Sequence, residues 1–464
     1  MHRYLNALIA ITLTLACRQA VPPAQGAAPH DASPQALFRQ WAATHAHPLR
    51  LDPLESAVGD LVPLGAIVGD SRLVAFGEPF HGGHEPLLMR NRIVKYLVST
   101  EGFTAVALET SLAKSKLLYD YVLGTSPASD SALRSAFSYG FGTLKENIEL
   151  VRWLRAWNAG RADSARVRIY GMDLTGQMAS SAAASVEAVL AYLDRVDPNA
   201  AAPLRQDVEP ILPRFTFERF PLLPAADQDA ISGKIQDLVS TLRGHQGRYV
   251  KASSLDDFDW AVHQAMNAFQ DASYLRLWPR GFRMSGISRD SLMASARRLA
   301  PEMELLGSVR ENGMADNLAW IVERESTRGR VHVFAHDLHL SRAEVVADEP
   351  LLNGHRGAGA YLAARFGPAY RVIGSYYGRA VGMPAGAESL LPDTAGIDGV
   401  LASPGLAAYL MGLHERSIPA PLSAWLAATH VTRTGNSGDQ VVRIAPSLAY
   451  DALVYFATIT PAHR

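Results

Sequence analysis

The segments RLVAFGE (residues 72–78) and FTAVALE (103–109) decide the fold of this chain, because each is a short apolar run that stops abruptly at a carboxylate. Two more runs have the same form, VRIYGMD (167–173) and VHVFAH (331–336), while a fifth, YRVIGSYYG (370–378), lacks the terminal ionisable residue. Short, nearly unbroken runs rich in Val, Ile, Phe and Tyr are typical of strands buried on both faces of a parallel sheet.

Helical patterns lie between these runs. Residues 34–44, 85–100 and 145–159 repeat apolar side chains at three- and four-residue spacing. Strands that alternate with helices indicate βαβ units. The sequence therefore predicts an α/β fold with a central parallel or mixed sheet flanked by helices.

Strand patterns stop between about residues 176 and 310, where helical periodicity, prolines and scattered aromatic residues replace them. We interpret this stretch as a helical insertion that caps the carboxyl ends of the strands. Its aromatic residues could line an apolar wall for a bulky substrate, but their helical spacing favours core packing. They are Trp260, Phe269, Tyr274, Trp278 and Phe282.

The composition excludes several classes of protein. The 464 residues include 44 Lys+Arg and 45 Asp+Glu, the net charge is −1, and 48% of the residues are hydrophobic. An ordinary apolar fraction with so little net charge argues against disorder, and the lack of a basic excess argues against nucleic-acid binding. The single cysteine excludes an internal disulfide framework and a site with several thiolate ligands.

The N-terminal residues predict export. Residues 1–17 combine Arg3 with an apolar stretch too short to span a bilayer, which is typical of a secretory signal. Cys17 follows Thr-Leu-Ala and is similar to the lipidated cysteine of a bacterial lipobox, while a plain signal peptide cut near residues 24–26 remains the alternative. Residues 18–34 are expected to form a flexible tether, and residues 35–464 the folded domain. We expect a periplasmic protein or a membrane-anchored lipoprotein.

Ionisable residues end four of the five predicted strands. They are Glu78, Glu109, Asp173 and His336. Ligands of open α/β sheets bind outside the carboxyl ends of the strands, and burying unpartnered ionisable groups there is costly. The set therefore predicts a functional site at this edge.

The sequence leaves two mechanisms open for such a site. A covalent serine or cysteine hydrolase is disfavoured, since no Gly-x-Ser-x-Gly is present and the only cysteine lies in the signal region. No glycine-rich phosphate loop follows a strand, so nucleotide binding has no support. Either a histidine held by carboxylates activates water as a general base, or His and carboxylate ligands hold a divalent metal.

Several blocks of sequence carry a resemblance to a known family. They are GEPFHG (77–82) followed by Arg90, GFTAVALE (102–109), YGMDLTG (170–176), RENGMADNLAWIVE (310–323) and VFAHDLHLSR (333–342). In these blocks the chain resembles the erythromycin esterase family. The resemblance implies an α/β fold with a helical subdomain and hydrolysis of a macrolactone ester without metal or other cofactor, an activity that would confer resistance to macrolide antibiotics.

The resemblance also implies roles for individual residues. His81 would be the general base that activates water, and Glu78 would polarise or orient it. Glu109 would be a second acid near the water, and Arg90 would hold the substrate carbonyl or the carboxylates. The expected partner is a small-molecule ester or lactone, and the sequence predicts no oligomeric state.

Further residues are assigned to the same site. By the resemblance, His336 and His339 would stabilise the oxyanion or protonate the leaving alkoxide. We expect His84 at the rim and Asp173 near the substrate, although a structural role for Asp173, holding a loop by hydrogen bonds, stays open. Phe80 stands where the family often has Thr, which makes the surroundings of His81 more apolar.

Two other functions remain compatible with the sequence. One is a metal-dependent hydrolase in which Glu78, Glu109, His336 or His339 are ligands. The other is a surface-anchored protein that binds a ligand or haem in the same pocket without turnover. Asp337, where Asn is common in the family, adds a charge whose effect on the substrate is open.

Overall fold

The computed structural model describes most of the chain after the predicted signal and tether. The described residues are 33–174, 182–279, 294–295, 298–348, 353–383, 396–434 and 440–464. The predicted signal peptide with Cys17, nearly all of the tether, the predicted start of the insertion at residue 176, and Phe282 lie outside them. Among the described helices, none has both the length and the apolar character that crossing a bilayer requires.

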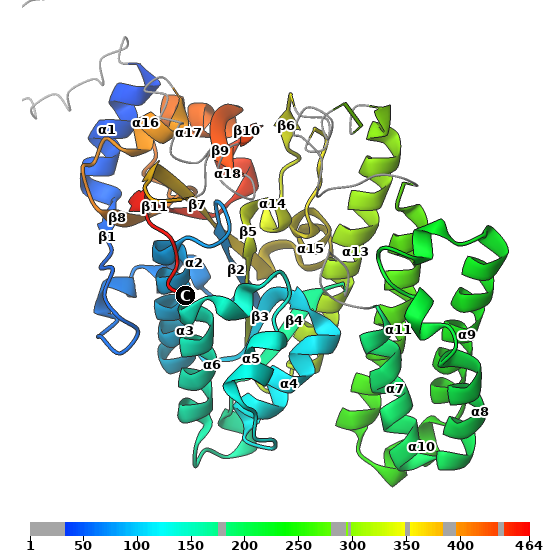
Figure 1. Cartoon of the computed structure of the whole chain (residues 1–464). Coiled ribbons are helices and arrows are strands. Elements are labelled where there is room, and N and C mark those ends of the chain that lie inside the picture. The colour runs from blue at the N-terminus through cyan, green and yellow to red at the C-terminus, as the bar shows by residue number, and fades with distance from the viewer. Residues whose placement is uncertain are drawn as a thin grey trace, which may run out of the picture.

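A mixed eight-stranded sheet forms the centre of the molecule (Figure 1). In spatial order its strands are β1 (His47–Pro48), β8 (Ala408–Gly412), β11 (Ala452–Ile459), β7 (Tyr370–Ala380), β2 (Leu73–Glu78), β5 (Arg330–His336), β3 (Phe103–Ser111) and β4 (Arg168–Asp173). From β11 to β4 each strand runs parallel to its neighbour. Strand β8 is antiparallel to β11, and β1 is antiparallel to β8. The predicted α/β fold is confirmed, as are the five predicted strands.

Burial on both faces explains the unbroken apolar runs. Every residue of β2 is buried. Leu73 and Ala75 belong to the core on one face, while Val74 and Phe76 belong to the core on the other. Because successive side chains of a strand point to opposite faces, both sets must be apolar.

Helices cover both faces. On one face lie α3 (His84–Thr100) and α6 (Lys145–Asn158), with the short α2 (Leu64–Val68) and α5 (Asp130–Ser135). The other face is covered by α1 (Pro34–His45), α13 (Ala300–Arg324), α15 (Ala358–Phe366), α16 (Ile397–Leu401) and α17 (Ala420–Ala427). Helix α4 (Leu112–Leu123) packs along β4, the edge strand. Two further short helices of the described residues are α14 (Asp337–Leu340) and α18 (Pro446–Ala449).

The insertion forms a helical subdomain with its own core. It comprises α7 (Ala183–Val196), α8 (Pro198–Val208), α9 (Ala225–Gly244), α10 (Gln246–Ala252) and α11 (Leu255–Leu277). These helices stand beside the sheet and contact it mainly through α4 and α13 (Figure 1). The expectation that they cap the carboxyl ends of the strands is therefore not met by the described helices. The predicted end of the insertion near residue 310 falls inside α13, which runs unbroken from Ala300 to Arg324.

The aromatic residues of the insertion serve mainly as core. Trp260, Tyr274 and Trp278 are buried. Trp260 stacks on Tyr170 of β4 with ring centroids 5.7 Å apart, so it attaches the subdomain to the sheet. Core packing therefore accounts for these three rings, whereas Phe269 is 38% exposed.

A small antiparallel sheet lies apart from the main one. It is formed by β6 (Val346–Ala347), β10 (Gln440–Ile444) and β9 (His430–Thr434). Thr434, the last residue of β9, donates a hydrogen bond from Oγ1 to the carbonyl of Pro79, 3.1 Å away. This contact brings the small sheet to the end of β2, where the predicted site begins.

Candidate functional site

The four ionisable residues predicted at strand ends come together, because β2, β5, β3 and β4 are consecutive in the sheet. Glu78 and His336 lie directly opposite each other in the β2–β5 register. Glu109 lies between Leu108 and Ser111, where the β3–β4 register shifts. The backbone at Glu109 therefore departs from the regular strand pairing. Parallel strands thus collect at one edge residues that lie far apart in sequence.

His81 sits between two of these carboxylates. Its Nδ1 is 2.8 Å from Glu78 Oε1, and its Nε2 is 3.9 Å from Glu109 Oε1. Gly82, with a φ of 78°, makes the turn that returns the chain into α3 just after His81. The side chain of His81 is 19% exposed, so the imidazole is accessible while both carboxylates are buried.

Glu109 is the most heavily contacted carboxylate of the site. Its Oε2 accepts a hydrogen bond from the backbone N–H of His336 at 2.9 Å. Its Oε1 lies 3.3 Å from His339 Nε2 and 3.4 Å from Arg310 Nη2. Burial alone would raise the pKa of Glu109, but the charges of His339, His81 and Arg310 hold it well below its usual range. Glu109 is therefore ionised at neutral pH.

This charge acts on His81. Burial by itself lowers the pKa of His81, but the Coulombic attraction of Glu109 and the hydrogen bond to Glu78 outweigh burial and raise the pKa above its ordinary value. Burial raises the pKa of Glu78, against the opposing effect of its hydrogen bond to His81. His81 is thus a strengthened base whose cationic form is stabilised.

Arg310 on α13 joins Glu109 to Asp173. Its guanidinium binds Asp173 in a bidentate manner, with Nη2–Oδ2 at 2.7 Å and Nε–Oδ1 at 3.1 Å. Tyr139 donates its hydroxyl proton to the same carboxylate. Tyr139 has a φ of 58°, which is unfavourable for a residue other than glycine, and its bonded side chain anchors it there. Asp173 therefore holds Arg310, and Arg310 faces Glu109.

His339 is held in its protonated form by two acids. Its Nδ1 lies 2.7 Å from Glu311 Oε1, while Nε2 faces Glu109. Burial would lower the pKa of His339, but Glu311 and Glu109 raise it to about 10. His339 thus supplies a fixed positive charge behind Glu109 at neutral pH.

The tautomer of His336 follows from its contacts. Its Nδ1 accepts a hydrogen bond from the backbone N–H of Leu338 at 3.1 Å, so in the neutral ring the proton is on Nε2. The ring lies 5.1 Å from that of His81, centroid to centroid. The Nε2 of His336 lies 3.5 Å from Thr434 Oγ1, so its N–H group is close to both Thr434 and the proposed base.

Two cavities adjoin His81 and its acids. One, of about 20 Å³, is lined by Glu78, Arg90, Glu109 and Phe141 among others; a water molecule needs roughly 10–15 Å³ measured in this way. Glu78, one of the residues that line it, has a buried Oε2 with no hydrogen-bond partner among the described residues. The other, of about 370 Å³, is lined by His81, Met383, Ala462 and Arg464 among others. The first suits a water molecule, and the second suits part of a small ligand.

The other residues predicted for the site lie elsewhere or act indirectly. Arg90 is buried and donates to Asn147 Oδ1 at 2.7 Å, so it lines the small cavity but forms no ion pair with the carboxylates among the contacts of the described residues. Burial lowers the pKa of Arg90 to about 10. Phe80 is fully buried and packs edge-on against Tyr377, in the core rather than at a pocket surface. His84 points to a separate cluster, with Glu146 2.6 Å away.

Asp337 is a buried acid that sequence analysis singled out only as a departure from the family. Both of its oxygens accept from the backbone N–H of Ser375, at 3.1 and 3.3 Å. Burial raises the pKa of Asp337 well above its usual range, against the opposing effect of the hydrogen bond from Ser375. A Cβ on Gly77 would lie 2.0 Å from Asp337 Oδ1, so only glycine fits beside this acid.

No role was predicted for four residues that surround the site, Arg310, Tyr139, Glu311 and His355. Arg310 and Glu311 begin one of the matching blocks, so the signal was present without a structural context to interpret it. Tyr139 follows no strand or motif, and its position depends on a contact with Asp173 that local pattern does not encode.

The residues that could hold a metal only partly match the expected ones, since His339 is among them. Within the described part of the chain, two groups of three bring their donor atoms within 4.8 Å of one another. They are Glu311 with His339 and His355, and His84 with Glu146 and His463. Glu78 and Glu109 belong to neither group.

The fold and the site together define an α/β protein in which the edge of a parallel sheet carries a carboxylate-held histidine near a water-sized cavity, an arrangement that suits acid–base chemistry. The comparisons with known proteins agree. The erythromycin esterase family model matches residues 98–459, a range that begins after the Glu78–His81 motif. The chain belongs to this family. Its membership indicates a hydrolase that acts on small-molecule esters.

Similarity to individual relatives is distant. The chain is 20% identical over 317 residues to erythromycin esterase type II of Escherichia coli, which covers 67% of this chain and 70% of that protein. A Bacillus cereus crystal structure superposes with a TM-score of 0.75 at 22% identity, covering 92% of this chain and 98% of that one. A mutant of the erythromycin esterase EreC in its open conformation gives 0.66 at 17% identity, with 90% and 98% coverage. At these identities the structures show the shared fold.

Proposed function

We propose that this chain hydrolyses a carboxylic ester or lactone, with a water molecule activated by His81 as the nucleophile. The observation that carries the proposal is the position of His81, with Glu78 on Nδ1 and Glu109 facing Nε2. A macrolide macrolactone is the leading candidate substrate, because the family and the Escherichia coli relative are named for erythromycin hydrolysis.

In the proposed mechanism, Glu78 holds the Nδ1 proton of His81, which leaves Nε2 free to accept a proton from water. The 3.9 Å between Nε2 and Glu109 Oε1 exceeds a direct hydrogen bond, and a water molecule that contacts both atoms can bridge it. As the water attacks the carbonyl carbon, its proton passes to His81. The ionised Glu109 stabilises the imidazolium that forms.

The other histidines complete the proposed reaction. His336 donates a hydrogen bond from Nε2 to the oxyanion of the tetrahedral intermediate and keeps its proton. His81 then returns its proton to the leaving alkoxide, and the carboxylic acid is released. His339 and Arg310 act indirectly, because their charges keep Glu109 ionised. No covalent intermediate is required.

The test is the loss of activity on replacing His81. His81→Ala should lower kcat on an ester substrate by roughly 10²–10⁴-fold, the usual contribution of a positioned base, without a change in melting temperature. His47→Ala, which removes an exposed histidine from β1, is the matched control. Full activity of His81→Ala would overturn the assignment.

A metal-dependent hydrolase is the second candidate, and one observation favours it. Glu311, His339 and His355 place donor atoms within 4.8 Å of one another next to Glu109. Two imidazoles and one carboxylate suit Zn²⁺. Three results together would favour this candidate over metal-independent hydrolysis. Chelation should remove the activity, Zn²⁺ should restore it, and His355→Ala should be inactive.

We further propose that the protein is exported and anchored by a lipid on Cys17. The support is the signal-like sequence of residues 1–17. Cell fractionation of the wild-type chain and of Cys17→Ser tests this: the lipoprotein should be in the membrane fraction, and the variant should be soluble in the periplasm.

A further inference from the structure

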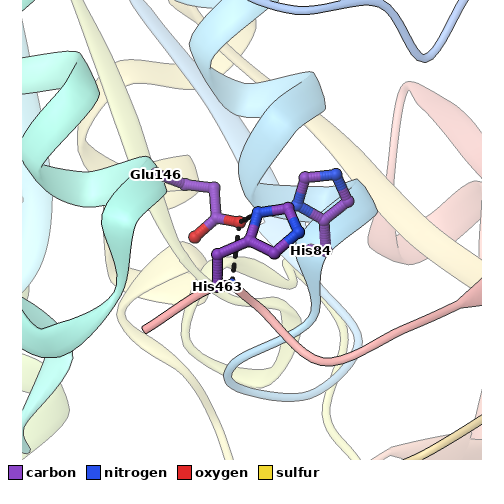
Figure 2. A group of neighbouring side chains, drawn as sticks. All are labelled: His84, Glu146 and His463. Carbon is purple, nitrogen blue, oxygen red and sulfur yellow. Dashed lines mark hydrogen bonds and ion pairs between the residues drawn. The ribbon is translucent and has the colours of Figure 1, made fainter.

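A second cluster of titratable side chains lies beside the proposed site and takes no part in the proposed reaction. It consists of His84 at the start of α3, Glu146 in the first turn of α6, and His463 in the C-terminal segment (Figure 2). His84 Nδ1 lies 2.6 Å from Glu146 Oε1, and His463 Nδ1 lies 3.1 Å from the same oxygen. The donor atoms of the three residues all lie within 4.8 Å of one another.

The donor set has the chemistry of a transition-metal site. Two imidazole nitrogens and one carboxylate oxygen suit Zn²⁺ and its neighbours in the first transition series, whereas Ca²⁺ and Mg²⁺ prefer oxygen ligands. Because the side chain of His463 is 60% exposed, an ion can reach the cluster from solvent without any rearrangement of the core.

Glu146 carries a separate observation that points to a ligand. Its side chain is 1% exposed, and its Oε2 is buried with no hydrogen-bond partner among the described residues. Leaving a buried carboxylate oxygen unpartnered is unfavourable. A cation bound between Oε1 and the two imidazoles would compensate the charge of this buried carboxylate in place of a proton on His84.

The backbone holds the three donors in place before any ion binds. His84 donates its N–H to the carbonyl of Thr460 at 2.7 Å, and Lys145 donates to the carbonyl of His463 at 2.8 Å. The N–H of His463 in turn donates to Glu146 Oε1 at 3.1 Å. Little conformational entropy would therefore be lost on binding.

A proton on His84 is the competing occupant of the same cluster. The short contact with Glu146 suits a charge-assisted hydrogen bond. A tetrahedral zinc site separates its ligand atoms by about 3.3 Å, given Zn–N bonds of about 2.0–2.1 Å. Rotation of the His84 ring must therefore open the 2.6 Å contact, whereas His463, at 3.1 Å, needs little movement.

We propose that His84, Glu146 and His463 bind one divalent transition-metal ion, Zn²⁺ in the first place, which ties the C-terminal segment to α3 and α6. The same segment walls the larger pocket, since Pro461, Ala462 and Arg464 line it together with His81. The ion thus fixes a wall of the pocket, and it is separate from the chemistry proposed for His81.

Zinc binding by the purified full chain, without a histidine tag, tests the proposal. The protein is treated with EDTA, desalted and titrated with ZnCl₂ in competition with a chromophoric chelator. The wild type should bind Zn²⁺, and His463→Ala should bind it at least about tenfold more weakly, since even residues behind the ligands contribute 10–100-fold. The control His47→Ala should match the wild type.

Melting temperatures provide a second readout that does not depend on catalysis. Zn²⁺ should raise the melting temperature of the wild type by mass action, and this rise should be lost in His463→Ala. Equal melting temperatures in EDTA would show that the variant is folded. Absence of zinc binding up to millimolar ZnCl₂, or equal affinity in His463→Ala, would overturn the proposal, as would loss of the zinc only in His355→Ala.

Discussion

Removing the charge of Glu109 tests the electrostatics of the site most sharply. The substitution Glu109→Gln keeps the shape of the side chain and removes a negative charge 3.9 Å from His81 Nε2. At an effective dielectric constant of about 20, two unit charges at this distance interact by about 4 kcal/mol, or about three pKa units. Arg310 and His339 already offset part of this charge, so the net effect is smaller, and we expect the pKa of His81 to fall.

The sign of the effect on rate follows from the role of His81. A general base must be neutral, so kcat/KM rises with pH through the pKa of His81, which lies above 6.5 in the wild type. In Glu109→Gln this rising limb should move to lower pH. The maximum of kcat/KM should also fall, because the imidazolium loses its counter-charge in the transition state.

The assay is a pH–rate profile of ester hydrolysis for the wild type, Glu109→Gln and Glu323→Gln. Glu323 is an exposed residue of α13, so the same chemical change there should leave the profile unaltered. A rising limb that stays in place in Glu109→Gln, or that moves to higher pH, would refute the reasoning.

Three further substitutions test the supporting contacts. Arg310→Ala leaves Asp173 as an uncompensated buried charge and should cost about 3–5 kcal/mol in urea unfolding, whereas Arg152→Ala, in an exposed ion pair, should change little. Gly77→Ala should destabilise the protein by about 1–3 kcal/mol, because the added Cβ meets Asp337; unchanged stability would contradict this. Burial raises the pKa of Asp337 and so favours its neutral form; the uncharged Asp337→Asn should therefore change kcat/KM little at pH 7, and a large loss measured there would show that the charge of Asp337 matters.

Local pattern was enough to predict the strands that carry the site. β2, β3, β4 and β5 are buried apolar runs that end in ionisable residues, and their parallel arrangement brings those residues together. Glu78, His81 and Glu109 could therefore be proposed as neighbours before any coordinates were known.

Contacts made by other elements could not be predicted in this way. Arg310 reaches Asp173 from the middle of α13, and Tyr139 reaches it from a loop with a left-handed backbone. β8 and β11 were not predicted, and the antiparallel edge that β8 and β1 form depends on pairing between distant segments. Such geometry is set by tertiary packing rather than by periodicity.

The most direct test of the central claim is mass spectrometry of erythromycin, followed by a panel of other esters, after incubation with the purified mature protein and with His81→Ala. The account predicts that the wild type adds one water to a substrate and that His81→Ala does not, with no acyl adduct on either protein. Hydrolysis by His81→Ala at the wild-type rate, or a covalent acyl-enzyme in the intact mass, would contradict direct attack by water activated by His81.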